Sequence, residues 1–150
     1  MNLLPVTASN VKEIVDFGLR TGAFAKAHGL DTYDPQYITR LWTGLIEANQ
    51  AGGMIATVAD ECAGVVAWVT CEGWYSQEPL VDIVLWATDP HHDSRLIGGR
   101  LLVAAIHEAT RRQCPLTLSL GPQTPVELSW SLARWGFKPR TLEYEWRPHG

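Results

Sequence analysis

Residues 81–113 read VDIVLWATDPHHDSRLIGGRLLVAAIHEATRRQ, and this stretch decides the expected fold. It begins with a run of apolar, β-branched-rich residues, which predicts a buried strand. Asp89-Pro90 ends the strand, because proline cannot donate to a sheet ladder. A short polar turn follows, and from Arg95 apolar residues recur at helical spacing as far as Arg112. The stretch is therefore expected to form a strand, a tight turn and a helix.

A glycine pair, Gly98-Gly99, falls in the expected first turn of this helix. The first N–H groups of a helix have no partner within it, so a glycine-lined helix start can approach an anion closely. Arg95 and Arg100 could add positive charge. The same glycines could instead serve only close packing of the helix on the sheet. The local pattern leaves both interpretations open.

The wider stretch resembles the acetyl-CoA-binding core of the GCN5-related N-acetyltransferases, the GNAT superfamily. In that family the central strand ends just before a proline. A turn carrying Arg/Gln-x-x-Gly-x-Gly/Ala then leads into a helix with a Leu-Leu pair. Here a proline and Leu101-Leu102 stand at those places. Counted from the proline, Asp93 falls at the Arg/Gln position, Leu96 at the first glycine and Gly98 at the last.

A shifted register also fits part of the motif. Arg95 and Gly98 then match its first two positions, and Arg100 replaces the last. In either register the backbone N–H groups remain, so the resemblance implies an acetyl-CoA site at the strand end and the helix start. The expected cofactor-binding residues are Trp86, Ala87, Thr88, Ser94, Arg95, Leu96, Ile97, Gly98, Gly99 and Arg100.

Apolar periodicity predicts the remaining elements. They are a strand at 2–7, helices at 11–19 and 35–49, strands at 54–59, 62–70 and 115–120, a helix at 126–135 and a strand at 141–147. This order, and the Gly136-Phe137 ending of the last helix, are similar to the GNAT pattern. The expected fold is a single mixed α/β (α+β) domain with a twisted, mostly antiparallel sheet flanked by helices. Four tryptophans are expected in its core: Trp42, Trp68, Trp130 and Trp135.

Acetylation of an amine needs a polarised thioester carbonyl and a group that takes the amine proton. Asp82 is the candidate base, because a carboxylate in an otherwise apolar strand needs a partner or a task. A salt bridge, or a strand-start position facing water, would equally explain it. The family often has a tyrosine as general acid four residues before the glycine of Gly-Phe, where this chain has Leu132.

Weaker candidates surround this set. Glu72 is a second candidate base, and Tyr75 and Tyr144 are the tyrosines nearest to the expected site. The remaining candidates are possible acceptor contacts or, for Gln123, a cofactor contact: His28, Asp31, Tyr33, Asp34, Trp74 and Gln123.

The composition narrows the class of protein. The 150 residues, 46% of them hydrophobic, are enough for one domain with a real core. A net charge of −4 argues against a nucleic-acid partner. Three widely spaced cysteines predict reduced thiols in a cytoplasmic protein, and no spacing is typical of a metal site. No apolar run approaches the roughly 20 residues of a membrane span, and no signal peptide is expected.

The expected function is transfer of an acetyl group from the cosubstrate acetyl-CoA to a primary amine of a small molecule or protein, by direct attack in a ternary complex. The alternative is a GNAT-fold protein without catalysis that binds or inhibits a partner. A modifier of charged tRNA is a third hypothesis, against which the net charge counts. An exposed edge of the last strand could support a homodimer.

Overall fold

The computed structural model describes residues 1–24, 33–72, 77–120, 126–140 and 148. Their helices and strands are β1 (Asn2–Pro5), α1 (Val11–Thr21), α3 (Pro35–Glu47), β2 (Ala51–Val58), β3 (Glu61–Glu72), β4 (Pro79–Thr88), α4 (Ser94–Arg112), β5 (Leu116–Leu118) and α5 (Val126–Arg134). The strand expected at 141–147 lies outside the described residues.

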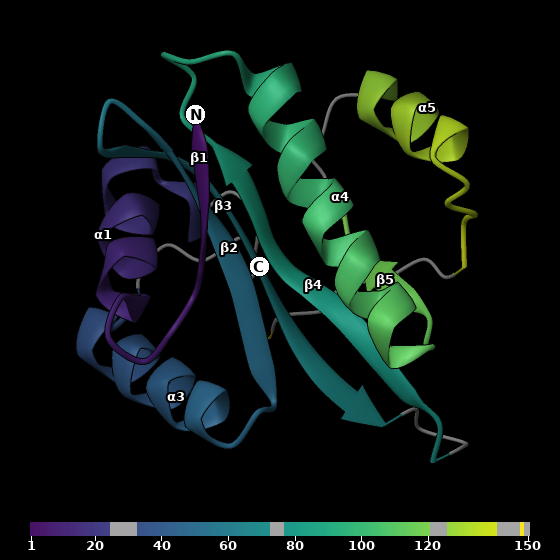
Figure 1. Ribbon diagram of the computed structural model, residues 1–150, viewed down its shortest axis with the longest axis horizontal. Helices are drawn as coiled ribbons and strands as arrows, with labels where there is room; N and C mark the ends of the chain where they lie inside the picture. The colour runs from purple at the N-terminus through teal and green to yellow at the C-terminus, as the bar shows by residue number, and fades with distance from the viewer. Residues whose placement is uncertain (25–32, 73–76, 121–125, 141–147, 149–150) are drawn as a thin grey trace.

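The strands form one five-stranded sheet in the order β1-β2-β3-β4-β5 (Figure 1). The first three pairings are antiparallel, and β4 pairs with β5 in parallel. This confirms the expected mixed, mostly antiparallel sheet and the β2–β3 hairpin. β1 is an edge strand, where Pro5 removes no hydrogen bond from the sheet interior.

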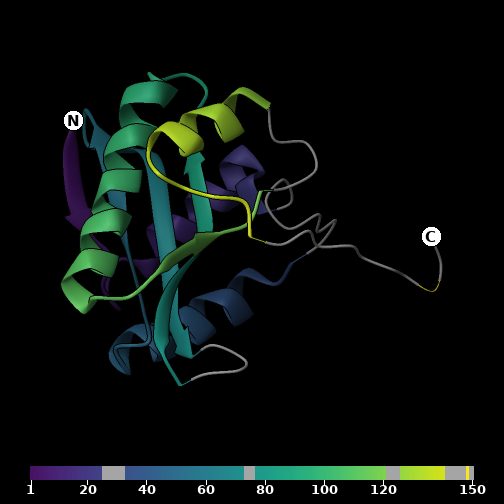
Figure 2. The ribbon, with the colours of Figure 1, turned by 90° about the vertical axis from the view of Figure 1, so that its right-hand side faces the viewer.

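Helices cover both faces of the sheet (Figures 1 and 2). α4 packs on one face, against β2, β3 and β4, while α1 and α3 pack on the other. The α4 core consists of Ala56, Ala63, Val66, Trp68, Val81, Ile83, Ile97, Leu101, Leu102, Ala105, Ala109 and Leu132. The α1/α3 core consists of Val6, Val11, Ile14, Phe17, Ala23, Phe24, Ile55, Val65, Ala67 and Leu85. Strand alternation sends neighbouring residues to opposite cores.

The glycine pair Gly52-Gly53, which follows the helix expected at 35–49, lies within β2. α3 ends at Glu47, before this glycine pair. Two residues later, Asn49 adopts a positive φ of 56°. Gly53 is needed for a different reason. A β-carbon there would lie 2.4 Å from the backbone oxygen of Val66 on the neighbouring strand. Close approach of two strands explains this glycine better than a helix stop does.

Two of the four tryptophans predicted in the core are exposed. Trp130 is 60% exposed and Trp135 is 49% exposed, whereas Trp68 is buried and Trp42 packs partly against the α1/α3 core. The error has a simple cause. Of the nine residues of α5, only Leu132 is buried, and the helix packs on the α4 core through Leu132 and the partly buried Leu128.

Candidate functional site

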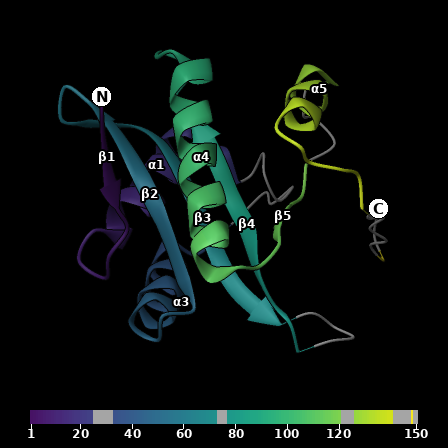
Figure 3. The same cartoon turned by 45° about the vertical axis from the view of Figure 1, so that its right-hand side comes forward.

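β4 and β5 pair over a short stretch and then part. The pairs are Val81 with Leu116, Asp82 with Thr117, and Ile83 with Leu118. Beyond Ile83, no strand within the described ranges pairs with this side of β4. Figure 3 shows β5 running away from β4 past this point. The result is a V between two parallel strands.

A β-bulge lies where the strands part. The register between β3 and β4 shifts between Ala67 and Trp68, which pair with Leu85 and Ile83. Val84 is therefore the extra residue, opposite no single partner. Ile83 belongs to the α4 core, while Val84 and Leu85 both pack with the α1/α3 core. The bulge thus re-aims the strand at the apex of the V.

Beyond the bulge, no strand that the structure describes pairs with the open side of β4. The N–H of Asp89 donates to the carbonyl of Ala63 at 2.8 Å, so residue 89 bonds toward β3. Hydrogen-bonding direction alternates along an antiparallel pair, so Trp86 and Thr88 direct their N–H and C=O groups to the opposite side. Among the described residues these groups have no strand partner. An extended ligand with amide groups could pair with them as a strand would.

The expected cofactor residues at the strand end contact α4. The indole Nε1 of Trp86 donates to the carbonyl of Gly98 at 3.0 Å. A β-carbon at Gly98 would lie 3.6 Å from the Thr88 methyl and 3.7 Å from the Trp86 ring, which is ordinary contact. Ala87 points to the other face and packs with the α1/α3 core. The structure therefore brings Trp86, Thr88 and Gly98 together.

At the start of α4, the chain's own Asp93 caps the helix. Its carboxylate accepts from the N–H of Leu96 at 3.1 Å, and its carbonyl accepts from the N–H of Ile97 at 3.0 Å. From Gly98 onward the N–H groups lie inside the helix. Of the expected backbone donors, only those of Ser94 and Arg95 are left over.

The side chains of this segment differ in exposure. Ser94, Arg95, Leu96 and Arg100 are exposed, and Leu96 is 50% exposed. Ile97 is buried in the α4 core, so its side chain is closed to a ligand. Gly98 and Gly99 lie in the second turn of α4, not in the first as expected, because the helix begins at Ser94, capped by Asp93, rather than near Arg95.

An ion pair between the half-exposed Arg20 and the buried Asp89 holds the turn between β4 and α4. Asp89 is 4% exposed, and its carboxylate accepts from the Arg20 guanidinium and from the N–H of His91. These bonds, that from His91 first, hold the pKa of Asp89 below its ordinary value. Arg20 also donates to the carbonyl of Cys62. The pair ties the end of α1 to the hairpin and to the turn.

The candidate base Asp82 lies at the apex of the V. It is half-buried, and its Oδ1 accepts from the Thr117 hydroxyl at 2.7 Å. The flanking residues Val81 and Ile83 belong to the α4 core, so Asp82 faces the α1/α3 side of the sheet. It is two residues from the bulge at Val84. The second candidate, Glu72, is exposed at the far end of the sheet, opposite Pro79.

The weaker candidates separate into three groups. Asp34 caps α3 by accepting from the N–H groups of Gln36 and Tyr37, and so has a structural task. Tyr33 packs against the α1/α3 core, its buried hydroxyl has no hydrogen-bond partner among the described residues, and burial raises its pKa. Leu132 is buried in the α4 core. Outside the described residues lie His28, Asp31, Trp74, Tyr75, Gln123 and Tyr144.

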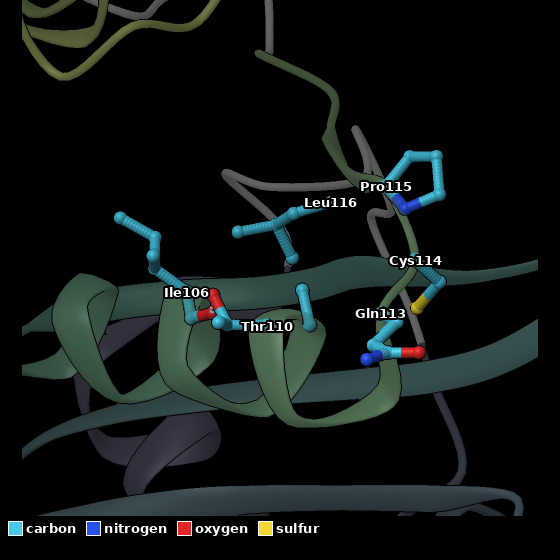
Figure 4. A pocket seen from close by; sticks show the side chains of 7 residues that line it. Ile106, Thr110, Gln113, Cys114, Pro115 and Leu116 are labelled. Atoms are coloured by element: carbon cyan, nitrogen blue, oxygen red, sulfur yellow. Dashed lines mark hydrogen bonds between the residues drawn. The ribbon is translucent and has the colours of Figure 1, made fainter.

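A broad depression on the surface lies where the C-terminal end of α4 leads into β5 (Figure 4). Its lining is Ile106, Ala109, Thr110, Gln113, Cys114, Pro115 and Leu116. The first of these is twelve residues after the start of α4, about 18 Å along the helix. The depression is apolar or neutral and lacks the acid–base groups of the V.

Two further observations concern metals and membranes. The described part of the chain holds no group of three or more His, Cys, Asp or Glu side chains that could bind a metal ion. Its cysteines, Cys62, Cys71 and Cys114, are free thiols. Of the helices that the structure describes, none is both long and apolar enough for a membrane span.

Sequence reasoning missed three contributors: Val84, Arg20 and Thr117. The bulge at Val84 cannot be recognised from the sequence, because the residues on either side of it are apolar. Arg20 resembles an ordinary basic residue in the last turn of a helix. Thr117 had a usable signal. It is a polar residue in a short parallel strand that follows a strand carrying one carboxylate.

No family model and no curated protein matches the sequence. Solved structures match nearly the whole chain. A GCN5-related N-acetyltransferase from Ralstonia eutropha JMP134 matches with a TM-score of 0.69 at 15% identity, over 96% of this chain and 96% of that chain. A predicted acetyltransferase with acetyl-CoA from Clostridium acetobutylicum matches with a TM-score of 0.78 at 14% identity, over 97% of this chain and 95% of that chain.

The chain has the GNAT fold. A third structure of this fold is an aminoglycoside acetyltransferase from an uncultured soil metagenomic sample, in complex with sisomicin. It has a TM-score of 0.72 at 15% identity, over 97% of this chain and 95% of that chain. The expected resemblance at the level of fold is thereby confirmed. The GNAT fold places the open edge of β4, the bulge at Val84 and the start of α4 around one V.

Proposed function

We propose that this protein transfers an acetyl group from acetyl-CoA to a primary amine of a small molecule or protein, by direct attack in a ternary complex. The observation that carries the proposal is the open edge of β4, which begins at a bulge and ends beside a helix start. Structures of the same fold include one with acetyl-CoA and one of an aminoglycoside acetyltransferase, both at low identity. They support the donor and the amine class.

The free backbone groups of Trp86 and Thr88 are suited to the two amides of a pantetheine arm. From Thr88 back to Val84 the strand spans four residues, or about 13 Å. An arm laid along this edge would bring a thioester to the apex of the V. Backbone N–H groups at the bulge could then hydrogen-bond the carbonyl oxygen and stabilise the charge that develops on it.

Asp82 is the base in this proposal, because it lies close to that apex. It lies two residues before Val84, about 7 Å along the strand, and can take the amine proton directly or through one water molecule. The Thr117 hydroxyl holds one carboxylate oxygen. Because Asp82 faces the α1/α3 side, the amine would approach from that side. The amine nitrogen then bonds to the carbonyl carbon, the carbon–sulfur bond breaks, and the electron pair leaves with sulfur.

The leaving group needs little help from the protein. Leu132, where the family often has a tyrosine, is buried in the α4 core and cannot donate a proton. A cysteine thiol has a pKa of about 8.5, far below that of an alcohol, and a thiolate of this kind can depart near neutral pH without a general acid. The absence of tyrosine at this position is therefore compatible with turnover.

The first test uses titration calorimetry with acetyl-CoA and a thiol-release assay over a panel of amines. We expect Asp82→Asn to keep acetyl-CoA affinity and to lower turnover by about 10²–10⁴-fold. Asp16→Asn on α1 removes the same charge from an exposed position and should change neither quantity. Unchanged turnover in Asp82→Asn would remove Asp82 as the base. No binding to the wild type at millimolar acetyl-CoA would contradict the transferase proposal.

A second function is a GNAT-fold binding protein without catalysis. It is favoured by the buried Leu132 and by the carboxylate of Asp93 at the helix start. The same two assays separate the alternatives, because a binding protein without catalysis would bind acetyl-CoA and release no thiol with any amine of the panel.

A further inference from the structure

The start of α4 is already occupied by an anion of the chain itself. The Asp93 carboxylate accepts from the N–H of Leu96, and its carbonyl takes the N–H of Ile97. A helix N-terminus favours negative charge through its unpaired N–H groups. Here the charge that it favours is supplied internally. A pyrophosphate arriving at this end would meet a like charge and only two remaining donors.

The next turn of the helix is covered as well. The Trp86 indole donates to the carbonyl of buried Gly98, so an aromatic ring lies over the backbone that a glycine would otherwise leave bare. Leu96 adds an exposed aliphatic side chain in the first turn of the same helix. The side chains of the chain itself therefore line the place where a diphosphate would need backbone contact.

Arg95 and Arg100 do not reverse this balance. Both are exposed to solvent, where an ion pair with a phosphate is weakened by salt and by the loss of side-chain freedom. Asp93 is adjacent in sequence to the two N–H groups that remain. The hydrogen bond from the N–H of Leu96 holds the Asp93 carboxylate at the helix end. The exposed guanidinium groups of Arg95 and Arg100 are not held there in the same way.

In contrast to the start of α4, the edge of β4 is open to a ligand. Beyond Ile83, β4 keeps its backbone groups free on the side of the V, and no described strand covers them. We propose that the donor is recognised through its pantetheine arm and thioester, and that the pyrophosphate of CoA contributes little to binding. The donor class is then acyl-pantetheine thioesters, with or without a nucleotide. This inference rests on the proposed function and specifies its donor.

The test compares two probes, acetyl-CoA and S-acetylpantetheine, by titration calorimetry at low salt. For the wild type we expect dissociation constants within about tenfold of each other. Asp93→Asn keeps a capping side chain and removes the charge. It should tighten acetyl-CoA binding by about tenfold and leave S-acetylpantetheine binding unchanged. Asp16→Asn, with the same change of net charge on the other face of the sheet, should alter neither.

The outcomes separate the two proposals. Wild-type protein that binds acetyl-CoA more than about a hundredfold tighter than S-acetylpantetheine would overturn the inference while leaving the transferase proposal intact. Equal effects of Asp93→Asn on both probes, or none on either, would also overturn it. If the wild type bound neither probe, the proposed function itself would fail.

Discussion

Among the described residues, Asp89 is a charged side chain that the fold buries almost completely. A buried carboxylate is tolerated only when it is paired and hydrogen-bonded. The Arg20 guanidinium and the backbone N–H of His91 supply these bonds at the junction of strand and helix. Because Arg20 is half exposed and Asp89 is buried, the two partners depend on the pair to different degrees. Removal of the arginine leaves a buried carboxylate without its counter-charge, whereas removal of the carboxylate charge leaves an arginine that water can solvate.

This inequality predicts different effects for the two partners. Arg20→Gln should lower the free energy of unfolding at pH 7 by about 2–3 kcal/mol, and Asp89→Asn by about 1–2 kcal/mol, in urea denaturation. An equal loss for both variants would show that Asp89 reaches water when Arg20 is gone.

The pH dependence of the same pair follows from the pKa of Asp89, which is held below its ordinary 3.8. A lowered pKa stabilises the folded state above the ordinary value, and this stabilisation is lost as the pH falls through the folded-state pKa. The stability gap between wild type and Asp89→Asn should therefore be full at neutral pH and close below about pH 4. A gap that stays constant in acid would mean that the charge of Asp89 does not contribute to it.

At the scale of elements, α4 and β2 use glycine for opposite reasons. Nothing lies within 4 Å of a β-carbon placed on Gly99, whereas one on Gly53 would be 2.4 Å from a backbone oxygen. Gly99→Ala should raise the melting temperature by about 2–4 °C, because alanine gains up to about 1 kcal/mol in a helix. Gly53→Ala should lower stability by about 2 kcal/mol or more. A destabilised Gly99→Ala would indicate a close contact to that glycine that the described residues do not make.

The elements also show what sequence reasoning can reach. The run from Asp82 to Arg112 was predicted correctly as strand, turn and helix, because periodicity records which side of an element is apolar. Periodicity does not indicate which element packs against the apolar side, and for this reason Trp130 was wrongly expected in the core. Nor does it record register. The bulge at Val84 and the cap by Asp93 depend on how neighbouring strands and turns fit together, and they shape the candidate site.

At the scale of the molecule, both cores share one sheet. β3 contributes Val66 to the α4 core and Val65 to the α1/α3 core, so neither core can form without this strand. We expect unfolding in urea to be a single transition, with the same midpoint by tryptophan fluorescence and by far-ultraviolet circular dichroism. Separate midpoints would show that α1 and α3 come away from the sheet before α4 does.

The open edge of β4 has a consequence for colloidal behaviour. Unpaired strand edges are templates on which a foreign strand can add, and proteins usually cover, shorten or charge them. Here the edge at Trp86 and Thr88 is apolar on one side and uncovered among the described residues. A ligand laid along it would satisfy the same backbone groups that an aggregating strand would use. A ligand bound along this edge is therefore expected to reduce self-association of the protein.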